Sequence, residues 1–323
     1  MQKTVLITGG AGYIGSQLTN TLLKAGYRVR ALDNLLYGDA GIRPFLGKPG
    51  YEFINGDIRH IEDVMSAMKG VHAVVDLASI VGDAACDKDR DRTLSINYEA
   101  TKILLEIAKY SGVRRFLFAS TCSVYGFQQD KVHETSALNP ISLYAESKLK
   151  SEDAILQQAG ELDSTIFRLA TVYGVSYRMR FDLVLNTLTI RALAEHAINI
   201  FGGEQWRPLV SVQDVAACFL LGLEAPRQKV SGQIFNLGSD AQNFRVWQLA
   251  DAVKEKFPDT KVEHSQELSD NRSYAVNFDK VRKVLGFQPA HTPIAAMEAI
   301  KQLWESGSVG SYQDNIYYNV KCL

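Results

Sequence analysis

The first half of the chain alternates short apolar runs with stretches whose apolar residues recur at helical spacing. The helical stretches, at about 16–25, 93–111 and 143–159, are each followed by a glycine that favours a helix end. Such alternation predicts parallel βαβ units and an α/β fold built on a doubly wound parallel sheet, the Rossmann architecture. The predicted buried strands are 5–7, 29–32, 51–54, 73–77, 116–119 and 165–169.

The pattern loosens after Gly174. Residues 234–237 predict one more strand, and the charged, irregular stretch 259–271 predicts a surface segment. No clean linker separates the two halves, so we expect a smaller, interleaved C-terminal substrate domain formed by 172–208 and 241–323. The larger domain is then 1–171, with 209–240 returning to it. Further helices are predicted at 183–194, 212–223, 247–256 and 294–304.

Composition excludes several classes of partner. The 323 residues carry a net charge of −1, so no global charge favours nucleic acid or a membrane surface. No apolar run approaches the ~20 residues of a membrane helix, and the N-terminus lacks the pattern of a signal peptide. We expect a cytoplasmic protein with reduced thiols and no metal site, because its cysteines have no metal-ligand spacing. They are Cys86, Cys122, Cys218 and Cys322.

A glycine-rich loop, TGGAGYIG at 8–15, follows the first predicted strand and opens the first predicted helix. In this context Gly9, Gly12 and Gly15 permit a tight turn, close approach to a pyrophosphate, and close packing of helix on strand. The unpaired N–H groups at the start of the helix favour phosphate. The loop therefore predicts a dinucleotide site.

Two aspartates follow the next strands. Asp33 ends the second predicted strand roughly 20 residues after the loop, where a carboxylate accepts hydrogen bonds from ribose hydroxyls and repels a 2′-phosphate. This position favours NAD over NADP. Asp57, in the segment Asn55-Gly56-Asp57-Ile58, is placed either to meet an adenine edge or to cap a helix, and the sequence leaves both readings open.

Tyr144 and Lys148 are four residues apart in a predicted helix, so they lie on one face. We expect the ammonium to lower the pKa of the tyrosine, so that the phenolate takes a proton from a sugar hydroxyl while a hydride leaves its carbon. Thr121 lies just past the strand 116–119, at the carboxyl edge where doubly wound sheets bind ligands. Its hydroxyl is placed to bind the same substrate oxygen.

Taken together, these motifs resemble the extended short-chain dehydrogenase/reductase family, in its NAD-dependent nucleotide-sugar epimerase/dehydratase branch. The likeness covers nearly the whole chain. It rests on TGGAGYIG (8–15), LDN (32–34), GDI (56–58), STCSVYG (120–126), YAESK (144–148), FRLATVYG (167–174) and RPLVSVQDVA (207–216).

The resemblance implies three groups of site residues and a homodimer. A catalytic set would be Thr121, Tyr144 and Lys148, and a nucleotide-diphosphate sugar would be bound by Thr121, Asn186, Arg207 and Arg272. The helices at 93–111 and 143–159 would pair with those of a second subunit as a four-helix bundle. NAD would be held by Gly9, Gly12, Tyr13, Ile14, Gly15, Asp33, Asn34, Asp57, Ile58, Leu77, Ala78, Tyr144 and Lys148.

Two positions depart from the pattern of that branch. Its 4,6-dehydratases carry an acidic pair directly after the catalytic threonine, whereas this chain has Cys122 and Ser123. Neither side chain can act as the acid and base that remove water, so we do not expect dehydration. Thr171 stands where relatives usually have asparagine, and a substrate contact at this position therefore cannot be copied from them.

The leading expectation is an NAD-dependent nucleotide-sugar epimerase. Tyr144 takes a hydroxyl proton, commonly at C4, NAD takes the hydride, and the transient keto-sugar turns over before the hydride returns. A one-way 4-dehydrogenase or keto-sugar reductase would use the same residues and is the alternative. A redox-inactive NAD-binding protein on the same fold is a third reading, against which the intact set of Thr121, Tyr144 and Lys148 argues.

Overall fold

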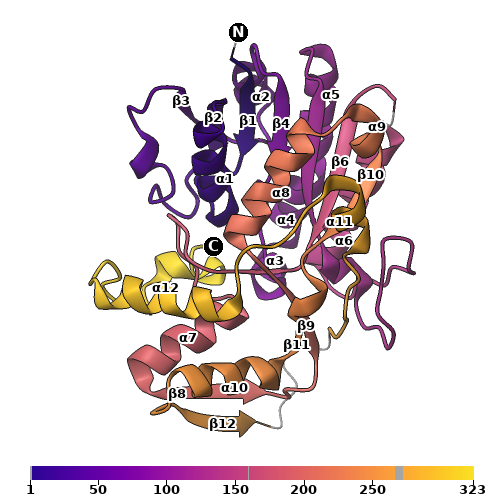
Figure 1. The fold of residues 1–323 in the computed structure, drawn as a ribbon. Coiled ribbons are helices and arrows are strands. Elements are labelled where there is room, and N and C mark those ends of the chain that lie inside the picture. The colour runs from indigo at the N-terminus through magenta and orange to yellow at the C-terminus, as the bar shows by residue number, and fades with distance from the viewer. Residues whose placement is uncertain (1, 159, 266–271) are drawn as a thin grey trace.

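A seven-stranded parallel sheet forms the centre of the larger part of the protein (Figure 1). The structure is a computed structural model that describes residues 2–158, 160–265 and 272–323. The strand order is β10-β6-β5-β4-β1-β2-β3, which confirms the predicted doubly wound α/β class. The strands are β1 (Thr4–Thr8), β2 (Arg28–Asp33), β3 (Tyr51–Asn55), β4 (Ala73–Asp76), β5 (Arg115–Thr121), β6 (Asp163–Leu169) and β10 (Gln233–Leu237).

Helices cover both faces of this sheet. Along β1, Val5 and Ile7 enter the core under α1 and α8, whereas Leu6 enters the core on the opposite face. A strand buried on both faces shows a continuous apolar run, which is why the short runs predicted strands. In the described ranges, no helix has the length and apolar character needed to cross a membrane. The covering helices are α1 (Tyr13–Lys24) and α8 (Val212–Glu224) on one face, and α2 (Ile61–Met68), α5 (Ala100–Tyr110) and α6 (Leu143–Gln157) on the other.

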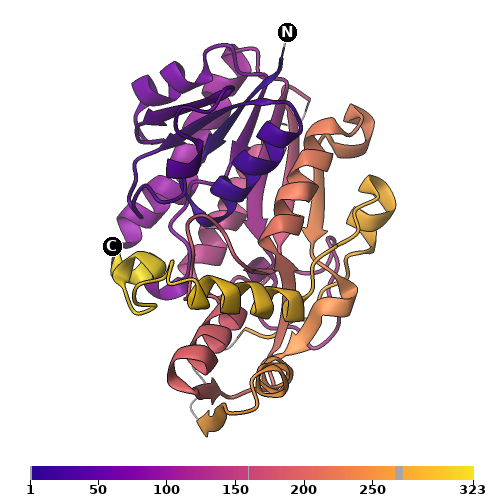
Figure 2. The ribbon, with the colours of Figure 1, turned by 60° about the vertical axis from the view of Figure 1, so that its left-hand side comes forward.

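A smaller layer lies below the carboxyl edge of the sheet in Figures 1 and 2. Its core joins residues of three helices and three strands, including Leu188, Ile198, Leu249 and Met297. Between the layers runs a three-stranded sheet of order β11-β9-β7. The elements are β7 (Thr171–Tyr173), α7 (Val184–Glu195), β8 (Ala197–Phe201), β9 (Trp206–Ser211), β11 (Asn243–Arg245), α10 (Val246–Lys256) and α12 (Pro293–Glu305).

The helix predicted at 93–111 has a different form. The chain passes from α4 (Arg90–Leu94) through a π-helical turn at Ser95–Glu99 into α5. Within this turn, the Asn97 side chain accepts from the Ile80 amide at 2.8 Å and donates to the Ile80 carbonyl at 2.9 Å. Its backbone carbonyl accepts the Ser151 hydroxyl at 2.7 Å, which ties the turn to α6. A local break of this kind commonly marks a functional position, and periodicity does not reveal it.

The prediction of an irregular surface segment at 259–271 is wrong for Lys261–Ser265, which form β12 parallel to β8. Its charged residues face solvent, so the strand lacks a clear apolar alternation. Residues 266–271 lie outside the described residues. The sequence analysis also did not predict α2, α3 (Asp83–Lys88), α9 (Arg227–Val230), α11 (Asp279–Leu285) or the strands β7, β8, β9 and β11.

Candidate active site

A cavity of about 690 Å³ opens at the carboxyl edge of the large sheet and extends to the smaller layer. All predicted cofactor residues line it, from the glycine loop to Ala78. Of the predicted catalytic and substrate residues, only Asn186 does not line the cavity. The others, which do line it, are Thr121, Tyr144, Lys148, Arg207 and Arg272.

The glycine loop is closely packed where it meets the strands. Gly9 has φ +68°, and a Cβ there would lie 2.9 Å from the Ala78 backbone. A Cβ at Gly15 would lie 2.3 Å from the Gly9 carbonyl oxygen. The α1 helix begins after Gly12 with no side-chain cap, so no capping side chain bonds its first N–H groups, and Gly12, Tyr13, Ile14 and Gly15 line the cavity. This arrangement fits a dinucleotide pyrophosphate at the helix N-terminus.

Asp33 is fixed at the end of β2 beside this loop. Its Oδ2 accepts the Ala11 amide at 3.0 Å, and its Oδ1 accepts the Leu35 amide at 2.8 Å. Burial raises the pKa of the Asp33 carboxyl, while these two bonds and the charge of Arg178 act against the rise. Each carboxylate oxygen still has a lone pair for a ribose hydroxyl.

Asp57 lies after β3 and is held by two neighbours. Its carboxylate accepts from the Arg59 guanidinium at 2.9 and 2.7 Å and from the Asn34 amide at 3.0 Å. The hydrogen bonds from Arg59 hold the pKa of the Asp57 carboxyl well below its usual range. The N-cap position of helix α2 is His60, which makes no side-chain capping bond, so the reading of Asp57 as the helix cap is wrong. The adenine contact of Asp57 stays a prediction.

Tyr144 lies in the first turn of α6, whose start is fixed by Ser142, because the Ser142 hydroxyl accepts the Ala145 amide at 3.3 Å. Burial raises the pKa of Tyr144, whereas a hydrogen bond with the Thr121 hydroxyl and the charge of Arg180 lower it. The expected net lowering by Lys148 is therefore wrong for this structure, because desolvation is the larger effect. Tyr144 is a neutral phenol that meets Thr121 at the end of β5.

Lys148 is a buried cation under the same cavity. It is 2% exposed, and its Nζ lies 4.6 Å from the centre of the Phe118 ring. Burial lowers the pKa of Lys148 to about 8, although the nearby Asp76 carboxyl opposes this. Asp76 is itself fixed by hydroxyl groups, from Thr8 at 2.6 Å and from Thr101 at 3.1 Å. At neutral pH the cavity wall thus holds a positive charge one helical turn from Tyr144.

Asn186 does not line the cavity, unlike the other predicted substrate residues. It is fully buried, its Oδ1 accepts the Gly174 amide at 2.9 Å, and its Nδ2 donates to the Arg180 carbonyl at 2.9 Å. These bonds join the two ends of the loop between β7 and α7. The Asn186 amide is thus engaged by the protein and does not line the cavity, and its contact with a diphosphate stays a prediction.

The structure adds lining residues that the sequence analysis missed. Two arginines come from the segment YRMRFD at 177–182, for which the sequence analysis predicted no element and singled out no residue. Asn319 belongs to the C-terminal segment and carried no local signal at all. The added residues include Tyr37, Arg178, Arg180, Asp182, Arg191 and Asn319.

Together, the fold and cavity define a class: dinucleotide-dependent α/β proteins of the short-chain dehydrogenase/reductase type. Residues 5–238 match the sequence profile of the NAD dependent epimerase/dehydratase family, and the chain belongs to that family. The predicted family, with its dependence on NAD, is thereby confirmed.

The alignments with three similar proteins span most of the chain. A UDP-glucose 4-epimerase from Rhizobium leguminosarum bv. trifolii is 29% identical over 329 residues, which are 94% of this chain and 97% of that protein. A protein from Bacillus subtilis (strain 168) named uncharacterized UDP-glucose epimerase YtcB is 31% identical over 249 residues, covering 72% of this chain and 76% of that protein. The crystal structure of UDP-glucuronic acid 4-epimerase from Bacillus cereus, in complex with UDP-glucuronic acid and NAD, superposes with a TM-score of 0.84 at 25% identity, covering 93% of this chain and 99% of that one.

Proposed function

We propose that the protein is an NAD-dependent nucleotide-sugar epimerase that works through a transient keto-sugar formed by oxidation at C4. The observation that carries the proposal is that Thr121, Tyr144 and Lys148 share one cavity with the glycine loop and Asp33. The names of the relatives, UDP-glucose and UDP-glucuronic acid 4-epimerases, support the same reaction.

The turn after Thr121 argues against dehydration. Cys122 is fully buried and donates its thiol to the Arg168 carbonyl at 3.2 Å, and it does not line the cavity. Ser123 does line the cavity, and its hydroxyl lies 3.3 Å from the Tyr274 hydroxyl. A thiol turned inward and a serine do not supply the acid and base that loss of water requires.

In the proposed reaction, Tyr144 first releases its own proton to solvent, and the resulting phenolate accepts the proton of the C4 hydroxyl while Thr121 hydrogen-bonds the same oxygen. When bound, NAD supplies the acceptor for the C4 hydride and gives that hydride back to the other face. Tyr144 then returns the proton to the oxygen, so the product has the mass of the substrate and one inverted centre. Lys148, one helical turn from Tyr144 on α6, carries a buried ammonium whose positive charge favours this phenolate. Asp33 and the start of α1 would hold the cofactor.

The test is incubation of the purified protein with NAD, without reductant, and with UDP-, GDP-, dTDP- and CDP-sugars deuterated at C4. We expect one of them to give a product of unchanged mass with an inverted centre by NMR and with the deuterium kept at C4. A product that has lost the hydroxyl hydrogen and the C4 deuterium, with reduced cofactor accumulating, would instead establish the one-way dehydrogenase. Loss of water would contradict the exclusion of dehydration, and no turnover of any sugar would favour a keto-sugar reductase or a redox-inactive protein.

Arg207 and Arg272 are proposed to hold the diphosphate of the substrate. Arg207 is 7% exposed on β9, and its Nη1 donates to the Arg272 carbonyl at 2.5 Å, which links the two residues. We expect Arg207→Ala to raise KM for the nucleotide-sugar roughly 10- to 100-fold, the size of a lost charge-assisted contact. Arg245→Ala is the control, because Arg245 pairs with Glu204 outside the cavity. Steady-state kinetics measure both variants, and an unchanged KM in Arg207→Ala would remove this assignment.

We also propose the division into an NAD-binding domain (1–171 with 209–240) and a substrate-binding domain (172–208 with 241–323). The pairing of β10 with β6 supports the return of 209–240, whereas α11, in the second range, packs on β10. A homodimer through the helices at 93–111 and 143–159 and a cytoplasmic location stay predictions.

A further inference from the structure

The loop that joins β7 to α7, residues 174–183, is fastened to the first turn of α1. The Ser176 hydroxyl donates to the Tyr13 carbonyl at 2.6 Å, and the Tyr13 hydroxyl donates to the Gly174 carbonyl at 2.6 Å. The Ser16 and Ser176 hydroxyls are 3.0 Å apart. Because the first turn of α1 is where a dinucleotide places its phosphates, the loop is held beside that position.

This loop carries two nearly buried arginines into the cavity wall. Arg180, 9% exposed, forms a bidentate pair with Asp182 at 2.8 and 3.1 Å. Arg178, 3% exposed, is held by neutral acceptors: its Nη1 donates to the Asn319 Oδ1 at 2.8 Å, and its Nη2 donates to the Ile316 carbonyl at 3.3 Å. Within the described ranges, its Nε has no hydrogen-bond partner. The nearby Asp182 carboxylate also attracts Arg178, but its bidentate hydrogen bonds go to Arg180, so the hydrogen bonds of the buried Arg178 guanidinium go to neutral groups.

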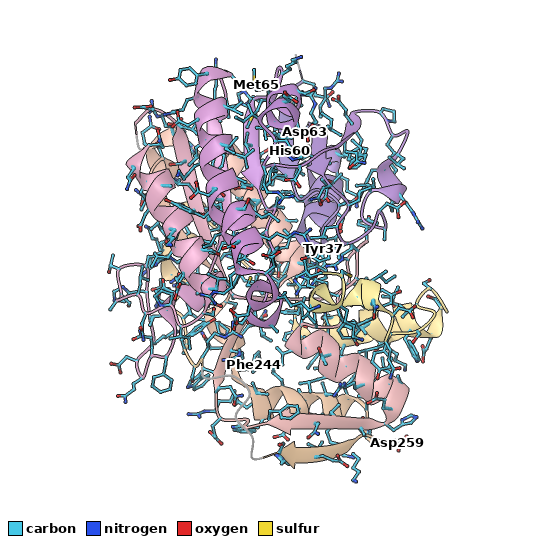
Figure 3. All side chains as sticks on the ribbon, turned by 180° about the vertical axis from the view of Figure 1, so that it is seen from behind. Tyr37, His60, Asp63, Met65, Phe244 and Asp259 are labelled. Atoms are coloured by element: carbon cyan, nitrogen blue, oxygen red, sulfur yellow. The ribbon has the colours of Figure 1, made fainter. Side chains whose placement is uncertain are left out.

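The surroundings of Arg178 indicate which kind of anion its guanidinium would bind. Its guanidinium carbon lies 4.6 Å from the ring centre of Tyr37, whose buried hydroxyl also lacks a partner among the described groups. Figure 3 labels Tyr37 where the chain after β2 meets the C-terminal segment. The charge of Arg178 lowers the pKa of the Asp33 carboxyl. Arg178 and Asp33 both line the cavity, so Arg178 lies on its cofactor side. Burial and the neighbouring Arg180 lower the pKa of Arg178 to about 10, although the charge of Asp182 opposes this.

We propose that Arg178 is a cofactor ligand whose guanidinium binds a phosphate oxygen of the bound dinucleotide, and that Asn319 is the residue that positions it. The inference rests on the proposed cofactor site. It adds an ionic contact to a phosphate site in which the glycine loop supplies backbone N–H groups. A planar guanidinium suits this task, because it presents several donors in a fixed geometry to phosphate oxygens.

Asn319 connects the arginine to the far side of the cavity. Its amide N–H donates to the Asp182 Oδ2 at 2.9 Å, and its side-chain Nδ2 donates to the Val81 carbonyl at 3.4 Å. The next residues are held by Lys88, whose Nζ donates to the Val320 carbonyl at 2.8 Å and to the Leu323 carbonyl at 3.2 Å. Two residues of the C-terminal segment, Ile316 and Asn319, thus hold the Arg178 guanidinium. We expect this segment to slow release of the cofactor.

The test measures the affinity of the cofactor-depleted protein for NAD, ADP-ribose and adenosine by calorimetry, together with the NAD release rate by stopped-flow fluorescence. We expect Arg178→Met to weaken NAD and ADP-ribose roughly 10- to 100-fold and adenosine less than about twofold, since adenosine has no phosphate. Arg178→Lys should keep part of the affinity, and Asn319→Ala should speed NAD release. Arg245→Met, which changes an arginine outside the cavity, is the matched control.

The other outcomes are equally decisive. Wild-type affinity of Arg178→Met for NAD and ADP-ribose overturns the inference. An equal loss for all three ligands, with a lowered melting temperature of the depleted protein, assigns a purely structural role to Arg178 and overturns it too. A raised KM for the nucleotide-sugar with unchanged NAD affinity assigns the guanidinium to the substrate diphosphate instead. If the wild type itself binds no NAD, the proposed function fails, and this inference fails with it.

Discussion

Replacing Tyr144 with phenylalanine is expected to lower kcat by about 10²- to 10⁴-fold, the usual contribution of a positioned general acid–base group. The reason is that the Tyr144 hydroxyl is the group that meets Thr121 at the end of β5, in the wall of the cavity. Phenylalanine keeps the ring and its packing, so NAD affinity should change less than about threefold, well under one hydrogen bond in free energy. Single-turnover kinetics with the accepted sugar, together with NAD titration, measure both quantities.

Tyr173→Phe is the matched control for this substitution. Tyr173 is also a buried tyrosine, but its hydroxyl bonds Gln242 at 2.9 Å and the His291 carbonyl at 3.0 Å and does not line the cavity. It should lose some stability and keep kcat. Full activity of Tyr144→Phe would remove Tyr144 from the mechanism, and equal losses in both variants would mean that the effect is structural.

Arg168→Met is expected to lower the free energy of unfolding by about 3–5 kcal/mol, because it leaves a buried carboxylate without its counter-ion. Arg168 on β6 and Glu152 on α6 are 2% and 1% exposed, and their Nη2 and Oε2 are 2.7 Å apart. Glu152 also accepts the Ser120 hydroxyl, so the pair ties α6 to the end of β5 just before Thr121. Chemical denaturation of the two proteins measures the difference.

The double variant Arg168→Met/Glu152→Met should recover most of that loss, since apolar residues of similar volume often replace a buried ion pair at little cost. A loss of less than about 1 kcal/mol in Arg168→Met would show that the pair behaves like an exposed one. A double variant as unstable as the single one would instead assign the loss to packing or to the hydrogen bond that Arg168 donates to the Tyr125 hydroxyl at 3.0 Å.

The sequence predicted the large sheet well, because its strands are buried on both faces and stand between helices that end at glycines. It predicted the smaller layer poorly. There β8 and β12 pair with each other. Strand β8 presents alternate residues to solvent and β12 exposes three of its five residues, so neither shows a continuous apolar run. The π-helical turn at Ser95–Glu99 was missed because its cause is tertiary: Asn97 is held by Ile80, which lies after β4.

The candidate site divides in a similar way. The glycine loop, Asp33 and the pair Tyr144 and Lys148 were predictable, because each is defined by spacing within one βα unit. The charge state of Tyr144 was not, since the pKa depends on burial that only the folded chain establishes. Arg178 and Asn319 are 141 residues apart in sequence and meet only through the fold, so no local pattern pointed to either.

The place of β10 limits how the protein can be divided into modules. This strand is the outer neighbour of β6, yet the chain reaches it only after passing through α7, β8 and β9. Since β6 is almost entirely buried, a fragment ending at residue 171 would expose an apolar strand edge of the kind that recruits other chains. A chimera that borrows its cofactor half from a relative must therefore take the β10 segment with it, and the natural unit of exchange is discontinuous.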